Sequence, residues 1–166
     1  LHVWMLKVDD VGHVSLDVCG TYMSYWRANG VDAKKQVKLG TTQEAGFQRA
    51  YVSDRRMERR NSDVRLDLCG LDVNAMNQAW EQFKTTPKPY NLVRHNCATV
   101  VASLLEIGSG VAPPFSPELK IDDFAGALGT RMLLRIRFLS ASIAMWTPNT
   151  VLMYAHEIQR RQQSGS

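Results

Sequence analysis

The chain has 166 residues, of which 45% are hydrophobic and 22% charged. This composition indicates one globular domain with a sizeable core, and it excludes a disordered or low-complexity chain. No run reaches the roughly 18 uncharged apolar residues of a membrane span. The opening LHVWMLKVDDVGH breaks with two acids where a secretory signal peptide would continue as apolar residues. The chain begins with Leu1 rather than Met, which predicts a fragment of a longer protein.

The net charge is +4, and this excess lies after residue 130, where five arginines outnumber one acid. A nucleic-acid binder usually carries a denser basic stripe, so we expect no nucleic-acid partner. The basic C-terminal segment is also apolar, which fits either a solvated face or contact with an anionic membrane surface. Three cysteines without CxxC or zinc spacing, and the lack of a phosphate-binding loop or dinucleotide motif, predict no metal and no cofactor.

The N-terminal part predicts strands. Residues 11–18 alternate between apolar and polar, and residues 21–26 are β-branched and aromatic, so the two runs predict a hairpin that turns at Cys19-Gly20. Residues 27–62 are polar and weakly patterned, which predicts an insertion or flexible excursion with a short helix near 42–50. Shorter strands are predicted over residues 2–8 and 64–69.

The C-terminal part predicts helices. Apolar residues at helical spacing follow Asp72, a predicted N-cap, and this helix ends before Pro87. Residues 97–107 predict a second helix, closed by Gly108. The predicted fold class is therefore α+β, with a small antiparallel sheet packed on the helix that opens with Cys97. Further helices are predicted over 117–127 and from Thr147-Pro148 to Gln159, while residues 133–139 fit a strand or a helix.

Cys97 is the candidate nucleophile among the cysteines. Asn96 can cap the helix that Cys97 opens. A thiol in a first helical turn faces unpaired backbone N–H groups and the positive end of the helix dipole, which both favour the thiolate. The same N–H groups can stabilise an oxyanion. Cys19 and Cys69 precede glycines at predicted strand ends, where a cysteine is more often a small buried hydrophobic residue.

A thiolate nucleophile needs a base, and His13 is the candidate. It lies inside the alternating strand on the face opposite the aliphatic residues, and a rigid strand can hold an imidazole against a helix start. His95 is only two residues from Cys97, too close in sequence to face it easily. By position alone, a single histidine in a strand or a single cysteine at a helix start is more often a structural residue than a catalytic one.

Three segments carry a resemblance to a known family: GHVSL at 12–16, YNLVRHNCATVVASLL at 90–105 and WTPNTVLMYAHEI at 146–158. Their order resembles the circularly permuted branch of the NlpC-type papain-like superfamily, which includes lecithin:retinol acyltransferase-like enzymes. The last segment looks like the tail of bacterial toxin and secretion-effector members. The resemblance covers residues 10–26 and 64–107, and 146–158 more loosely. It implies one papain-like catalytic domain over residues 1–166, as the C-terminal piece of a longer effector.

The resemblance also implies roles for individual residues. Cys97 would be the nucleophile, His13 the general base and acid, and Asn96 the support of the helix start beside the oxyanion. The third position, which orients the imidazole, falls on Ser24, where acyltransferase members commonly have a second histidine. Asp17 shares a strand face with His13 but lies about 13 Å along the strand, too far for direct contact.

The chemistry implied is acyl transfer through a thioester, without metal or cofactor. The first hypothesis is a phospholipase A-like acyl hydrolase or acyltransferase that acts on phospholipids as an antibacterial toxin, with Arg135, Arg137 and Trp146 at the lipid surface. The second is an amidase or peptidase on cell-wall peptide, and the third is a non-enzymatic binding domain. The effector resemblance predicts delivery without a classical signal peptide, action in the target-cell envelope and a cognate immunity protein as partner.

Overall fold

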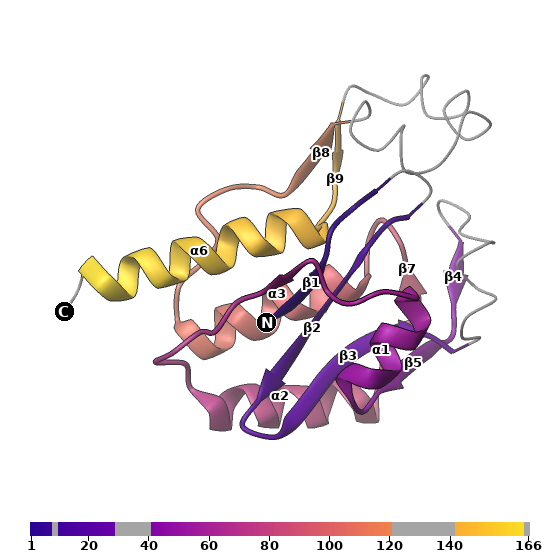
Figure 1. Ribbon diagram of the computed structural model, residues 1–166, viewed down its shortest axis with the longest axis horizontal. Coiled ribbons are helices and arrows are strands. Elements are labelled where there is room, and N and C mark those ends of the chain that lie inside the picture. Colours follow the sequence, from indigo (N-terminus) through magenta and orange to yellow (C-terminus); the bar gives the residue numbers. More distant parts are fainter. Residues whose placement is uncertain (8–9, 29–40, 121–141, 165–166) are drawn as a thin grey trace.

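A computed structural model describes residues 1–7, 10–28, 41–120 and 142–164 (Figure 1). Its centre is an antiparallel sheet in the order β5-β3-β2-β1-β6. Two short strand pairs, β4 with β7 and β8 with β9, lie outside this sheet. The strands are β1 (His2–Trp4), β2 (His13–Val18), β3 (Thr21–Arg27), β4 (Thr42–Gln43), β5 (Ala45–Gln48), β6 (Val64–Arg65), β7 (Tyr90–Asn91), β8 (Glu118–Lys120) and β9 (Ser142–Ala144).

Helices cover both faces of the sheet (Figure 1). On one face, α3 packs on β2 and β3, and α2 and α6 flank it. On the other face, the Asp54 side chain of α1 forms hydrogen bonds with His13 of β2 and Ser24 of β3. The predicted α+β class with an antiparallel sheet on the Cys97 helix is confirmed. The helices are α1 (Tyr51–Glu58), α2 (Val73–Thr85), α3 (Cys97–Ser109) and α6 (Pro148–Ser164).

The predicted hairpin forms from β2 and β3. Leu16 pairs with Met23 across the strands, and both side chains are buried in the core under α3. Cys19 and Gly20 both have positive φ, 48° and 87°, which is the tight turn that the Cys-Gly pair predicts. The alternation thus separates the side chains of the hairpin into one set facing α3 and another facing α1.

The helices α2, α3 and α6 begin where the sequence predicts; α2 ends before Pro87 as predicted, while α3 and α6 end later. The Asp72 carboxylate accepts a hydrogen bond from the Ala75 backbone N–H at 2.9 Å, as an N-cap does. The predicted stop of α3 at Gly108 is wrong, because Gly108 packs against Met76 within the helix and Gly110 closes it with φ of 67°. The last helix passes the predicted end at Gln159 and reaches Ser164.

The segment 27–62, predicted as an insertion or flexible excursion, contains regular structure in its described part after residue 40. The residues there form β4, β5 and α1. The predicted helix near 42–50 is instead mainly strand, because β5 pairs along β3 with Phe47 opposite Tyr25. Long-range pairing of this kind leaves no local pattern in a polar segment.

Other boundaries also differ. The strands predicted over 2–8 and 64–69 form only over His2–Trp4 and Val64–Arg65. Glu118–Lys120 is a strand instead of the start of a helix over 117–127. The rest of that segment and residues 133–139 lie outside the described residues. In the part of the chain that the structure describes, every helix is too short or too polar to cross a bilayer.

Candidate active site

His13 occupies the first position of β2 and is buried on all sides, with 1% of its surface exposed. Its ring stacks on the indole of Trp26 with centroids 4.2 Å apart, and the indole of Trp4 lies 5.5 Å away. Gly12 precedes it with φ of 69°, and a Cβ there would lie 2.3 Å from the Trp4 carbonyl oxygen. Only glycine fits at residue 12, where the chain comes this close to β1. The rings of Trp4 and Trp26 on either side leave the His13 imidazole little freedom to rotate.

The carboxylate of Asp54, on α1, lies against this imidazole and is completely buried. His13 Nε2 is 3.1 Å from Asp54 Oδ2, which also accepts a hydrogen bond from the Tyr22 hydroxyl at 2.7 Å. Asp54 Oδ1 accepts hydrogen bonds from Ser24 Oγ at 2.9 Å and from Trp26 Nε1 at 2.7 Å. Each carboxylate oxygen thus has two partners, which is what a buried charge requires.

These contacts set the charge of the pair. Burial alone would lower the pKa of His13, but the charges of Asp54 and Cys97, with the hydrogen bond to Asp54, raise it to about 10. Burial alone would raise the pKa of Asp54, but the charge of His13 and the hydrogen bonds outweigh it and hold that pKa below its usual value. The imidazolium–carboxylate form is therefore favoured at neutral pH.

Cys97 lies at the first position of α3, where Asn96 fixes the helix start. Asn96 Oδ1 accepts a hydrogen bond from the Thr99 N–H at 2.9 Å. Asn96 Nδ2 donates to the carbonyl oxygens of Leu92 at 2.7 Å and Trp146 at 2.9 Å, which joins three segments at this point. Because Asn96 caps Thr99, the N–H groups of Cys97 itself and of the residue after it are the first-turn donors left for an oxyanion.

His13 connects the two halves of the site. Its Nε2 is occupied by Asp54 and Ser24, and the charge of Cys97 contributes to its raised pKa. Cys97, His13 and Asp54 follow one another in the order that a nucleophile, a base and an orienting carboxylate take in a catalytic triad. Cys97 lies near enough to His13 to affect the pKa of the imidazole, and hydrogen-bonding reach between the two stays a prediction.

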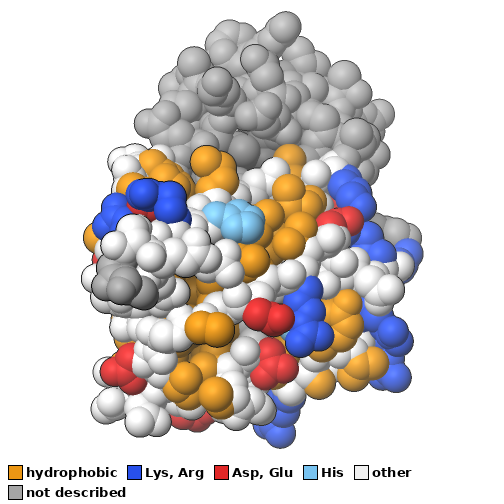
Figure 2. Space-filling model, turned by 60° about the vertical axis from the view of Figure 1, so that its left-hand side comes forward, with side chains coloured by type: hydrophobic (Ala, Val, Ile, Leu, Met, Phe, Trp, Pro, Cys, Tyr) orange, Lys and Arg blue, Asp and Glu red, His pale blue; other side chains and the backbone are white. Residues whose placement is uncertain are grey.

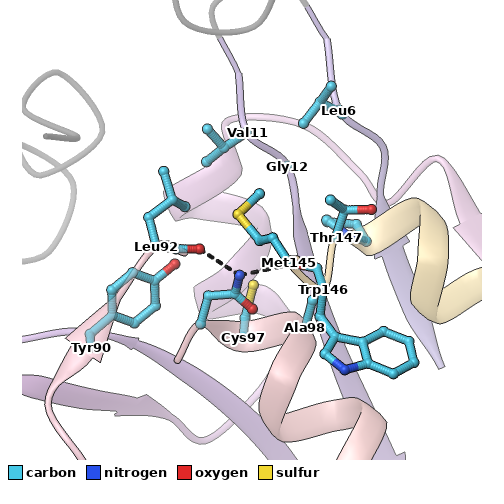
Figure 3. Close-up of a pocket in the computed structure, with 12 residues that line it drawn as sticks. Leu6, Val11, Gly12, Tyr90, Leu92, Cys97, Ala98, Met145, Trp146 and Thr147 are labelled. Atoms are coloured by element: carbon cyan, nitrogen blue, oxygen red, sulfur yellow. Dashed lines mark hydrogen bonds between the residues drawn. The ribbon is translucent and has the colours of Figure 1, made fainter. Parts of the chain in front are cut away.

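An apolar pocket lies over Cys97 (Figure 3). Cys97 is 5% exposed, and in the close-up Met145 and Leu92 lie on its pocket side, while the indole of Trp146 points away from it. The hydroxyl of Tyr90 and the short Thr147 side chain are among the few polar groups of the lining. The pocket is lined by Leu6, Val11, Gly12, Tyr90, Leu92, Asn96, Cys97, Ala98, Met145, Trp146, Thr147 and Pro148.

Ser24 lies beside His13, but it is not the only residue that contacts the imidazole in the orienting position for which the sequence predicts it. Its Oγ is 3.0 Å from His13 Nε2 and also donates to Asp54. The negative charge at this nitrogen comes from Asp54, which sequence reasoning missed. The sequence pattern that marks Asp54 is weak, because it consists only of an acidic residue on the buried side of a short polar helix, between Tyr51 and Met57. Asp17 is exposed, and the structure gives it no contact with His13.

The remaining predicted residues fall in different places. Trp146 lines the pocket, and its ring packs against Phe115 and Tyr154 at centroid distances of 6.0 and 5.8 Å. Arg135 and Arg137 lie outside the described residues.

The prediction that Cys19 and Cys69 are small buried residues is wrong, because both are exposed and only Cys97 is buried. Cys19 lies in the β2–β3 turn, where its side chain points away from the sheet core.

The described surface carries mixed charge. On the face in Figure 2, basic and acidic side chains lie near one another between hydrophobic ones, and no extended field of one sign forms among the described residues there. Within the described ranges, no group of three or more His, Cys, Asp or Glu side chains is placed to hold a metal ion.

Ser24→Ala is expected to lower turnover by about tenfold and the free energy of unfolding by about 1.5–3 kcal/mol, the range for a hydrogen bond to a charged group. The loss is limited because Asp54 keeps three other donors. Steady-state kinetics and urea denaturation would measure both quantities. If Ser24→Ala is as inactive as a variant without the Asp54 charge, Ser24 itself orients the imidazole.

Stability should also depend on the protonation of His13. Its folded pKa of about 10 exceeds the unfolded value of about 6.5, so the stabilisation is complete below pH 6.5 and is lost as the pH rises toward 10. The free energy of unfolding should fall by on the order of 1 kcal/mol per pH unit between pH 7 and 9. Urea denaturation of the wild type and His13→Gln at both pH values tests this. Equal slopes in the two proteins would show that His13 does not cause the fall.

Comparison with known families gives one match. The family described as the IcsB middle domain matches residues 24–165, more than half of the chain. The match includes Asp54 and Cys97 and begins after His13. No curated protein and no solved structure matches the chain.

Proposed function

The chain belongs to the IcsB middle-domain family, and we propose that it is a cysteine-dependent acyl hydrolase or acyltransferase with a permuted papain-like site. The observation that carries the proposal is the buried His13–Asp54 pair, with Cys97 near enough to contribute to the raised pKa of His13. A completely buried carboxylate and a buried imidazolium are costly in a purely structural role. Perturbed groups of this kind beside a pocket are typical of catalytic sites.

In the first half of the proposed reaction, the Cys97 thiolate attacks the carbonyl carbon of an ester and forms a C–S bond. The electron pair of the carbonyl moves to its oxygen, which first-turn N–H groups of α3 stabilise. The tetrahedral species then collapses, the C–O bond to the leaving alcohol breaks, and His13 gives that alcohol its proton. Asp54 holds the imidazole in the orientation that both proton transfers need.

In the second half, water or another acceptor attacks the thioester while His13 takes its proton. Collapse of the second tetrahedral species breaks the C–S bond and releases the acid or the transferred acyl group. Cys97 leaves as thiolate and His13 is again protonated. Buried walls around His13 and the apolar cover over Cys97 limit water near the thioester, which favours an acceptor that brings its own apolar group.

The pocket supports an acyl-lipid substrate over a peptide. Its lining next to Cys97 is mostly aliphatic and aromatic, including Leu92, Met145 and Trp146. The pocket has a volume of only about 10 Å³, so it takes at most the carbons next to the reacting carbonyl, each of which gains about 0.8 kcal/mol when buried. A cell-wall peptide would instead need partners for its amide groups, which this lining offers only through a few polar atoms. We therefore favour phospholipid acyl esters.

Membership of the IcsB middle-domain family suggests a secreted bacterial effector. Action on the membrane lipids of the target-cell envelope follows from the proposed substrate and is part of the proposal. An antibacterial role and a cognate immunity protein stay predictions from the sequence resemblance.

The proposal is tested by incubating the protein with phospholipid vesicles and, separately, with cell-wall fragments, followed by mass spectrometry of the products. We expect free fatty acid and lysophospholipid, or an acylated acceptor, from the vesicles. Release of peptide from the fragments with intact phospholipid would identify the protein as an amidase instead. No product from either substrate would contradict the proposed lipid activity.

A further inference from the structure

Trp26, on β3, contacts both members of the buried His13–Asp54 pair. Its Nε1 donates a hydrogen bond to Asp54 Oδ1 at 2.7 Å. The face of the same indole lies against the His13 imidazole, with ring centroids 4.2 Å apart and planes inclined by 25°. Trp26 is itself buried, so both contacts form away from bulk water. One rigid side chain is therefore in contact with the base and with the carboxylate that orients it.

The second indole beside His13 is bound differently. The ring of Trp4 lies 5.5 Å from the imidazole at an angle of 47°. Its Nε1 donates to the backbone carbonyl oxygen of Arg60 at 3.1 Å, and this group does not belong to the buried pair. Trp4 thus encloses the imidazole, whereas Trp26 encloses it and also binds its carboxylate.

Both contacts of Trp26 favour the charged form of their partner. The face of an indole attracts a cation, and this attraction is stronger where water is excluded. The N–H group at the edge of the ring donates to the carboxylate, as a charge-assisted hydrogen bond. Burial alone would raise the pKa of Asp54, but the charge of His13 and several hydrogen bonds, that from Trp26 among them, lower it. Face and edge together therefore match an imidazolium beside a carboxylate.

We propose that Trp26 is a positioning residue for the reaction at Cys97, which holds the His13 imidazole and the Asp54 carboxylate in one geometry while protons move to and from the imidazole. The inference rests on the proposed function, because Trp26 acts through the base of that reaction. His13 must give a proton to the leaving alcohol and later take one from the acceptor. A ring that is stacked on an indole and bound to the same carboxylate keeps its orientation through both steps.

Two substitutions separate the face of the indole from its N–H group. Trp26→Phe keeps an aromatic ring beside His13 and removes one donor to Asp54, while Trp26→Leu removes both features. We expect kcat on vesicle lipids to fall about tenfold in the first variant and about hundredfold in the second, with little change in KM. Trp80→Phe is the matched control. Trp80 is also buried, but its ring packs against Phe47 and Phe83, and kcat should stay at the wild-type value.

NMR titration of His13 gives a readout that a purely structural role would not change. The titratable groups that act on the imidazole are Asp54 from α1 and Cys97 from α3, and Tyr22 from β3 donates to the Asp54 carboxylate. Trp26→Leu leaves all three in place. Loss of the aromatic face should therefore weaken the proton affinity of the imidazole by about tenfold, which lowers its pKa. Trp26→Phe should keep most of that affinity.

The wild type provides a test that needs no variant to fold. The indole N–H resonance of Trp26 should shift as His13 loses its proton, because both contact the same carboxylate, while that of Trp80 should not follow this titration. A Trp26 resonance that ignores the titration would overturn the inference. So would a folded Trp26→Leu, checked by circular dichroism, with wild-type kcat or an unchanged His13 titration. If the titrations behave as expected but the wild type cleaves no vesicle lipid, the proposed function fails while the hold of Trp26 on the pair stands.

Discussion

Cys97→Ala is expected to abolish acyl-ester turnover while the fold stays intact. Loss of the nucleophile removes the thioester route altogether, and such losses amount to about 10⁴-fold or more in rate. The side chain is small, and its replacement should change the free energy of unfolding by only about 1 kcal/mol. Steady-state turnover of vesicle lipids and urea denaturation of the same preparations measure the two effects separately.

Cys69→Ala is the matched control for this variant. Cys69 is exposed, and the structure gives it no contact with the pocket. Its turnover should equal that of the wild type. Full activity in Cys97→Ala would rule out the cysteine mechanism, whatever the fold. Equal loss in both variants would point to a general effect of thiol removal on the protein.

Asp54→Asn is expected to reduce turnover by about 10³–10⁴-fold, as loss of the orienting carboxylate does in hydrolytic triads. Asparagine keeps the shape but has one oxygen and one NH₂ group. In either orientation of the amide, its NH₂ group faces two other hydrogen-bond donors and cannot accept from them. These donors are Trp26 and Ser24 on one side and Tyr22 and His13 on the other. We therefore also expect a loss of about 3–5 kcal/mol in the free energy of unfolding.

The same substitution should change the charge of His13. Without the carboxylate, burial dominates, and the pKa of His13 should fall below its present value of about 10. NMR titration of the imidazole follows this directly. Asp67→Asn, at an exposed carboxylate, should leave both activity and the titration unchanged. An unaltered His13 titration in folded Asp54→Asn would mean that the carboxylate does not set the charge of the imidazole.

Local patterns in the sequence predicted the elements that carry the nucleophile and the base. The alternation of residues 11–18 predicted β2, and with it the place of His13. The Asn96 cap and the apolar stripe that follows predicted the start of α3 at Cys97. Both signals are short-range, because strand alternation and helix capping depend on neighbouring residues.

The carboxylate could not be predicted in this way. Asp54 comes from a short helix in a segment that is polar and weakly patterned. Its burial depends on donors from β3, which the sequence places about 30 residues earlier. Contacts of that separation leave no periodic trace, so Ser24, the polar residue expected beside His13, was assigned the role instead.

The most direct test of the account is the capture of the covalent intermediate. Wild-type protein is mixed with phospholipid vesicles, quenched with acid within the first turnovers, digested and examined by mass spectrometry. The account predicts a fatty acyl group on the peptide that contains Cys97, removable by neutral hydroxylamine as a thioester and absent from Cys97→Ala. Lipid turnover without any acyl adduct on Cys97, or an adduct on Cys19 or Cys69 instead, would contradict it.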